Sequence, residues 1–260
     1  GMPIIEATSG NTGISLAALG KHYNHPVYIF MPDWVSEERV KIMKMYGAEV
    51  YLFSKGQGGF KRCIKEAKKF AKEKGGFLAN QFANKDNILA HYETTAQEII
   101  NQIEEDMGGF VSGVGTGGTL IGVGKKLKNY NKDIEIVAIE PDKMPLISKN
   151  RIIGSHKIEG IGDEFIPELL DKNIIDKVIL INDDDAINMA RKLSCQLGIG
   201  VGISSGANFI GCAIAGKETK KPFVTVFADD NKKYLSTELS EEINNNPKFI
   251  SNKIELLSYE

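Results

Sequence analysis

The sequence is poor in the residues that mark several classes of protein. It has only three cysteines, and Cys63, Cys195 and Cys212 lie far apart along the chain. An odd number of widely spaced cysteines does not build a disulfide framework, so we expect a reduced, cytoplasmic protein. The four histidines show no metal-ligand spacing, and we therefore predict no metal site.

Long apolar runs and blocks of one charge are also missing. No apolar stretch approaches the ~18 residues that cross a bilayer, and no charged start precedes an apolar segment. The 32 basic and 34 acidic residues nearly cancel to a formal charge of −2, and neither sign forms a block. We therefore expect neither a membrane nor a nucleic acid as partner.

The sequence does contain a regular alternation of strand-like and helix-like segments. Residues 27–32, 134–141 and 201–204 are short apolar runs rich in Val and Ile, and helix-like runs separate such segments. Strands that are apolar throughout are typical of a parallel sheet covered on both faces, so we predict an α/β fold. Ser36 and the acidic run 183–185 indicate where two of the helices begin.

No linker between domains is obvious, and FANKD at 82–86 is the best candidate for a crossing between two domains. We predict a smaller N-terminal domain over 1–85 and a larger domain over 86–240. The chain after Leu239 is polar and rich in asparagine, and we interpret 241–260 as a C-terminal appendage.

Three glycine-rich turns, at 9–13, 113–119 and 204–206, each follow a predicted strand and open a helix. Glycine lets the backbone approach a ligand closely, and the start of a helix offers unpaired amides with a partial positive charge. The carboxyl ends of parallel strands are where open α/β sheets bind ligands. The three turns together predict an anion site, although each alone is also explained as a packing turn.

The second turn has two interpretations. Residues 113–118 match the G-x-G-x-x-G spacing of a dinucleotide site, and Glu140 follows at a distance suited to a ribose. That motif normally opens its domain, however, and here several strand–helix units precede it. Because Thr116 and Thr119 add hydroxyl donors that suit a terminal phosphate, we favour a phosphomonoester and keep the dinucleotide as an alternative.

The chain resembles the cysteine synthase (O-acetylserine sulfhydrylase) family from about residue 3 to residue 237. In order, the matching segments are EATSGNTGISLA, QFAN, HYETTAQEI, GVGTGGT, AIEP, HKIEGIGDEFIP, VGISSGA and KKYLST. The resemblance implies a fold type II (tryptophan-synthase-β-like) enzyme that uses pyridoxal 5′-phosphate (PLP). It further implies two open, mostly parallel α/β domains with the cofactor cleft between them, the smaller domain being mobile.

The resemblance also implies a role for each loop residue. The PLP phosphate would be held by Gly115, Thr116, Gly117, Gly118 and Thr119. The substrate carboxylate would be held by Thr8, Ser9, Gly10, Thr12 and Gln81. Asn11 would contact the cofactor's phenolic oxygen, and Ser204 its ring nitrogen, although a serine at a helix start is also a common cap. Because serine does not stabilise a charged pyridinium, this pairing favours loss of a β-leaving group over transamination.

The implied reaction is formation of L-cysteine from O-acetylserine and sulfide, by a homodimer that also binds serine acetyltransferase. Two alternatives share these motifs: cystathionine β-synthase-type activity, and a non-catalytic relative that binds the C-terminal tail of serine acetyltransferase.

Two departures from the family pattern stand out. The Schiff-base lysine of the family lies in an S-x-K-D-R-like segment upstream of TSGNTG, and no such segment occurs here. We therefore expect an N-terminally truncated chain without a catalytic residue of its own, inactive in this form. In addition, Asp163 and Glu164 stand where small residues usually follow GIG, which affects the expected substrate preference.

Overall fold

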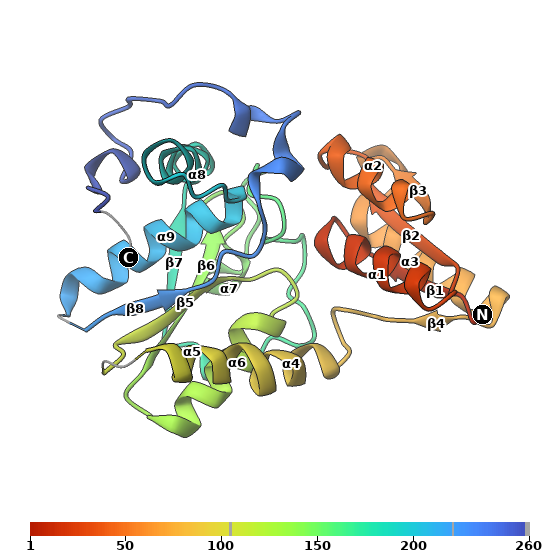
Figure 1. Cartoon of the computed structure of the whole chain (residues 1–260), viewed down its shortest axis with the longest axis horizontal. Helices are drawn as coiled ribbons and strands as arrows, with labels where there is room; N and C mark the ends of the chain where they lie inside the picture. Colours follow the sequence, from red (N-terminus) through yellow and green to blue (C-terminus); the bar gives the residue numbers. More distant parts are fainter. Residues whose placement is uncertain (104–105, 220, 258–260) are drawn as a thin grey trace. The chain divides into compact units, whose positions relative to one another are not determined.

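The computed structural model describes residues 1–103, 106–219 and 221–257. It divides into two compact units (Figure 1). Unit 1 comprises Gly1–Gln81 and Lys233–Thr237, and unit 2 comprises Phe82–Lys232 and the chain from Glu238 on. The chain therefore passes from unit 1 to unit 2 after Gln81, and returns briefly near its end.

Unit 1 contains a parallel four-stranded sheet in the order β3-β2-β1-β4. The strands are β1 (Ile4–Ala7), β2 (Val27–Pro32), β3 (Glu49–Phe53) and β4 (Phe77–Leu78). The helices are α1 (Asn11–His22), α2 (Glu37–Met45) and α3 (Gly59–Lys74), with a short 3-10 turn at Lys55–Gln57. Because β1 is an inner strand, the loop that follows it emerges from the middle of the sheet edge.

The core of unit 1 explains why its segments fold in this way. Strand β2 is almost fully buried and contributes Ile29 and Met31, which pack with Ala17 of α1 and Met43 of α2. Helix α3 turns a stripe of small and aromatic residues towards β1 and β2. Its lysines face away from this stripe, as the 3.6-residue periodicity predicts.

Unit 2 contains a second parallel four-stranded sheet, in the order β7-β6-β5-β8. Its strands are β5 (Gly109–Gly113), β6 (Glu135–Pro141), β7 (Lys177–Ile181) and β8 (Phe223–Thr225). Its helices are α4 (Asp86–Ala90), a π-helical turn (His91–Thr95), α5 (Ala96–Gln102), α6 (Gly118–Tyr130), α7 (Leu146–Lys149), α8 (Asp183–Leu197) and α9 (Ile203–Ala215). Short 3-10 turns lie at Lys172–Ile174, Gly216–Glu218, Asn231–Tyr234, Glu238–Ser240 and Ser251–Lys253.

The unit 2 sheet is covered on both faces. Helix α9 packs on one face with α8 outside it, and α6 packs on the other beside α4 and α5 (Figure 1). Phe110, Leu120, Leu127 and Ile136 are fully buried between α6 and the sheet. The predicted α/β class with mostly parallel, open sheets is thus confirmed. In the described residues, none of the helices combines the length and the apolar character needed to span a membrane.

Local details differ from the sequence prediction. Residues 201–204 do not form a strand, because Ile203 already begins α9 and the Gly202 amide bonds to the Asp229 carbonyl. Helix α8 is capped by Asn182, whose side chain accepts from two amides, rather than by the acidic run that follows it. Ser36 is at the N-cap of α2, but its hydroxyl accepts from Arg39 instead of capping the helix.

Within the predicted appendage, residues 241–257 are bound to helix α8 of unit 2. The buried carboxylate of Asp185 accepts from the amides of Ile250 (2.7 Å) and Ser251 (2.9 Å). Arg191 donates to the carbonyls of Leu239 and Glu242. Helix α8 therefore uses buried charges to hold this segment, whose own sequence is too polar to supply a core.

Candidate active site

The loop between β5 and α6 presents backbone amides at the start of a helix. Gly117 is the N-cap residue of α6, with φ of 86°, and no side chain caps the helix. The first amide that bonds to the helix's own backbone is that of Ile121, which bonds to the Gly117 carbonyl. Within the described chain, the amides of Thr119 and Leu120 have no acceptor. This is the arrangement that binds anions at helix N-termini.

Two glycines of this loop are required by their surroundings. A Cβ on Gly115 would lie 2.3 Å from the carbonyl oxygen of Gly160, and one on Gly118 would lie 2.0 Å from the side-chain oxygen of Asn87. Both distances are far shorter than any real contact. The Gly160 oxygen is backbone and cannot give way, so position 115 must be glycine, whereas a side chain at position 118 would have to displace the Asn87 amide group from Thr116. The loop backbone is thereby left accessible to a phosphate group.

The two threonines of the loop are held by residues that the sequence analysis did not assign. Thr116 Oγ1 accepts from Asn87 Nδ2 (2.9 Å) and from the Gly118 amide (3.2 Å). Thr119 Oγ1 lies 3.1 Å from His91 Nε2, and His91 Nδ1 lies 3.0 Å from Thr95 Oγ1. Burial lowers the pKa of His91, which favours the neutral imidazole. His91 lies in the segment HYETT, one of the segments that resemble the cysteine synthase family, and this could have identified it from the sequence.

Ser204 is not a helix cap. It lies in the first turn of α9, the N-cap residue is Gly202, and the Ser204 side chain makes no hydrogen bond within the described residues. One turn later, Asn208 Oδ1 accepts from the Gly113 amide at 2.8 Å. This bond ties α9 to the end of β5, so the start of α9 lies beside the strand that leads into the loop Gly115–Thr119, which we call the phosphate loop after its expected ligand.

The hydrogen bonds of the Glu140 carboxylate argue against a dinucleotide site. Its carboxylate, 2% exposed, accepts from the amides of Ile147 (2.8 Å) and Ser148 (3.0 Å) and from the Ser148 hydroxyl. The acid that could have bound a ribose therefore holds the start of α7 instead.

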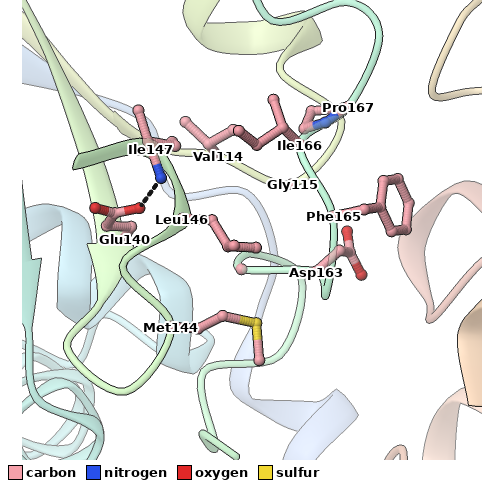
Figure 2. Close-up of a pocket in the computed structure, with 11 residues that line it drawn as sticks. Val114, Gly115, Glu140, Met144, Leu146, Ile147, Asp163, Phe165, Ile166 and Pro167 are labelled. Atoms are coloured by element: carbon pink, nitrogen blue, oxygen red, sulfur yellow. Dashed lines mark hydrogen bonds between the residues drawn. The ribbon is translucent and has the colours of Figure 1, made fainter. Parts of the chain in front are cut away.

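A pocket in unit 2 lies against the phosphate loop (Figure 2). Gly115 and Asp163 both line it, on neighbouring loops, opposite the strand that carries Glu140. Its other lining residues are mainly apolar: Val114, Met144, Leu146, Ile147, Gly162, Phe165, Ile166 and Pro167. Burial in this lining, with a smaller contribution from Glu164, raises the pKa of Asp163 to about 6.

In unit 1, the loop after β1 is joined to Gln81. Thr8 Oγ1 accepts from the Gly10 amide (3.1 Å), which closes the loop on itself. Thr12 Oγ1 donates to Gln81 Oε1 (2.7 Å), and Gln81 Nε2 donates to the Ala7 carbonyl (2.7 Å). Segments 69 residues apart, both expected to bind a carboxylate, are thus brought together.

A buried arginine, also missed by the sequence analysis, lies beneath the same loop. A Cβ on Gly10 would lie 2.4 Å from Arg39 Nε, so position 10 must be glycine. Arg39 is 1% exposed and donates to the hydroxyls of Ser36 and Tyr234 (2.7 Å to the latter). Its positive charge adds to that of the α1 N-terminus, where Gly10 is the N-cap residue.

The predicted site residues therefore fall into two groups, each assembled within its own unit. Unit 1 holds Thr8, Ser9, Gly10, Asn11, Thr12 and Gln81, and unit 2 holds Gly115–Thr119 and Ser204. Their individual roles stay predictions. No group of three His, Cys, Asp or Glu that could hold a metal ion occurs among the residues that the structure describes.

Parallel sheets with glycine-containing loops that open helices at the strand ends define the class of this protein as α/β, with two candidate anion sites. Comparison with known proteins narrows this class. A family model described as "Pyridoxal-phosphate dependent enzyme" matches residues 1–229. The chain is also 42% identical to cysteine synthase B of Campylobacter jejuni over 238 residues, which cover 91% of this chain and 79% of that protein.

Solved structures agree with this family. A hydrogen sulfide-producing enzyme from Fusobacterium nucleatum is 47% identical, with a TM-score of 0.91 over 96% of this chain and 77% of that chain. O-acetylserine sulfhydrylase isoform 3 from Entamoeba histolytica is 39% identical, with a TM-score of 0.86 over 97% and 76% of the two chains. The chain belongs to the family of PLP-dependent enzymes of fold type II, and its cofactor is pyridoxal 5′-phosphate.

Substitution of Gly115 by alanine tests the phosphate loop. Because the new Cβ would clash with the backbone oxygen of Gly160, the loop must shift. The amides at the start of α6 would then no longer point to one phosphate position. We expect the affinity for PLP, measured by equilibrium dialysis, to fall at least about tenfold, the equivalent of ~1.4 kcal/mol. Gly56→Ala is the control, because a Cβ there meets nothing nearer than 3.8 Å. Equal PLP affinity in both variants would contradict the assignment.

Proposed function

We propose that this protein is a cysteine synthase-like enzyme that forms L-cysteine from O-acetylserine and sulfide by β-replacement. The cysteine synthase relatives support this reading. The observation in this chain that carries it is the Thr12–Gln81 hydrogen bond. That bond joins the two segments that would grip an amino-acid carboxylate.

The residues present fit the cofactor's phosphate. A dianion needs several donors on three oxygens, and the loop offers helix-start amides, two hydroxyls and no obstructing side chain. Thr116 and Thr119 would donate hydroxyl protons to the phosphate, held in place by Asn87 and His91. When bound, PLP supplies the electron sink for bond changes at the amino acid's Cα and Cβ.

The substrate's carboxylate would bind at the start of α1. The amides of this first turn and the Gln81 amide group would donate to it, and Arg39 beneath Gly10 would stabilise its charge. The Thr12 hydroxyl, which donates to Gln81 Oε1, would turn its one proton to the carboxylate when the substrate binds. Ser204 would face the ring nitrogen with a neutral hydroxyl. This keeps the electron sink weak enough to favour loss of the β-substituent.

We further propose that none of this chain's own lysines holds the cofactor covalently. Three lysines near the site elements are engaged elsewhere. Lys125 lies 3.7 Å from Asp171, Lys126 lies over the Tyr92 ring, and Lys143 is paired with the buried Asp183 at 2.7 Å. Covalent attachment would then need an S-x-K-D-R-like segment, which residues 1–260 do not contain.

Borohydride reduction of the PLP-loaded chain, followed by peptide mapping, tests this point. We expect no lysine to carry the reduced cofactor in stoichiometric amount, and we expect PLP to leave on dialysis. The matched comparison is a form extended upstream to include such a segment, which should carry one labelled lysine. Stoichiometric labelling of a single lysine within residues 1–260 would contradict the proposal.

A second candidate function is release of sulfide from a thiol-bearing amino acid such as L-cysteine. One neighbour is described as a hydrogen sulfide-producing enzyme, and Asp163 lines the pocket beside Gly115. A carboxylate there repels the hydrosulfide anion but can accept a proton from a neutral nucleophile such as water. Asp163, with its pKa raised to about 6, is thus the residue that would decide which nucleophile reacts.

Product assays separate these functions, with O-acetylserine plus sulfide, O-acetylserine plus homocysteine, or L-cysteine alone. Each assay is run on residues 1–260 alone and on the same chain with an S-x-K-D-R-like segment added upstream, which is the extended form. Cysteine synthesis as the fastest reaction supports the first proposal. The second proposal is supported if sulfide release from L-cysteine is the fastest reaction and meets two further conditions. Its rate should fall below about pH 6, where Asp163 becomes protonated, and should be about 100-fold lower in Asp163→Asn. No turnover of any pair by the extended form would contradict both.

The predicted homodimer and the predicted contact with serine acetyltransferase rest on the resemblance alone, and both remain proposals.

A further inference from the structure

Glu6 is a buried carboxylate that the reaction does not use directly. It lies on the inner strand β1, two residues before Thr8, and is 2% exposed. Burial raises its pKa to about 7, against the opposing effect of nearby backbone amides, chiefly those of Gln81 and Ala7, which donate to it. Burying a carboxylate this completely costs folding free energy. We therefore expect its hydrogen bonds to have a role that an apolar side chain could not fill.

The hydrogen bonds of Glu6 converge on Gln81. Glu6 Oε2 accepts from the Gln81 amide at 3.0 Å, and Oε1 accepts from the Ala7 amide at 2.7 Å. Gln81 Nε2 in turn donates to the Ala7 carbonyl, so both ends of the Gln81 residue are tied to the same short stretch of β1. Strand β4 ends at Leu78, so no strand pairing holds Gln81 at this point.

This arrangement fixes the direction of the Gln81 side chain. With the backbone anchored by Glu6 and Nε2 bonded to Ala7, the Oε1 atom is aimed at the Thr12 hydroxyl, 2.7 Å away. Thr12 lies in the first turn of α1. A network of four hydrogen bonds therefore links the Glu6 carboxylate to the loop that would bind the substrate, directly through Gln81 and also by way of Ala7.

We infer that Glu6 is a positioning residue for substrate binding, acting through Gln81 to set the carboxylate-binding geometry of Thr12 and the start of α1. The inference rests on the proposed function for the identity of the ligand. The claim that Glu6 positions Gln81 does not depend on the ligand, because it follows from the hydrogen bonds between these residues.

The replacement Glu6→Gln is the sharpest test. It keeps the shape but puts an NH₂ group opposite an amide N–H that needs an acceptor, so one of the two amide bonds is lost. At pH 8, where wild-type Glu6 is ionised, we expect the PLP-loaded chain to bind L-alanine about tenfold more weakly. L-alanine has no β-leaving group, so binding is measured by calorimetry without turnover. Hydrogen exchange at the amides of Ala7 and Gln81 should be faster in the variant.

Three controls separate positioning from general destabilisation. Cys63→Ala removes a buried side chain from α3 of the same unit and should leave L-alanine affinity unchanged. L-alaninamide, which lacks the carboxylate, should bind wild type and Glu6→Gln equally. In a Gln81→Ala background, Glu6→Gln should cause no further loss, because residues that act through one another are not additive.

The outcomes are distinct. Additive losses in the double variant, or unchanged exchange at Gln81, would overturn the inference. If wild type binds no amino acid, the proposed function fails at this site, and hydrogen exchange at the Gln81 amide alone decides the role of Glu6.

If Glu6→Gln does not fold, the same measurements are made on Glu6→Asp, since the shorter carboxylate cannot reach both amides. Full exchange protection and wild-type affinity in that variant would contradict the inference.

Discussion

The structure depends on one electrostatic arrangement, a helix that starts directly after a parallel strand through a turn without side chains. The turn lets the unpaired amides of the first helical turn point at a ligand, and the helix dipole makes that point attractive to anions. The chain uses this arrangement at the start of α6, where Gly117 is the N-cap, and at the start of α1, where Gly10 is. A phosphate and a carboxylate are the two anions that a PLP enzyme of this class must hold.

The supporting residues differ between the two sites according to the ligand. At α6, neutral donors and acceptors surround the threonines: Asn87, and His91 with a lowered pKa. At α1, charged groups are buried below the loop, Arg39 under Gly10 and Glu6 behind Gln81. The start of α6 is thus supported by neutral groups, and the start of α1 by ionisable ones.

The sequence predicted the fold and the loops, but not what lies behind them. Continuous apolar strands and glycine turns are local patterns, so the two parallel sheets and the 113–119 loop followed from them. Glu6, Arg39 and Asn87 could not be assigned, because their roles come from contacts with residues distant in sequence. Residues 201–204 were misread as a strand because an apolar run does not distinguish a buried helix start from a strand.

The central claim is that the backbone amides at the start of α6 bind the phosphate of the cofactor. Amide chemical shifts of the ¹⁵N-labelled chain, followed during titration with PLP and separately with pyridoxal, test it most directly. The account predicts that PLP shifts the amide signals of Thr116, Gly117, Gly118, Thr119 and Leu120, and that pyridoxal, which has no phosphate, leaves them largely unchanged. Binding of PLP that leaves these amide signals unmoved would contradict it.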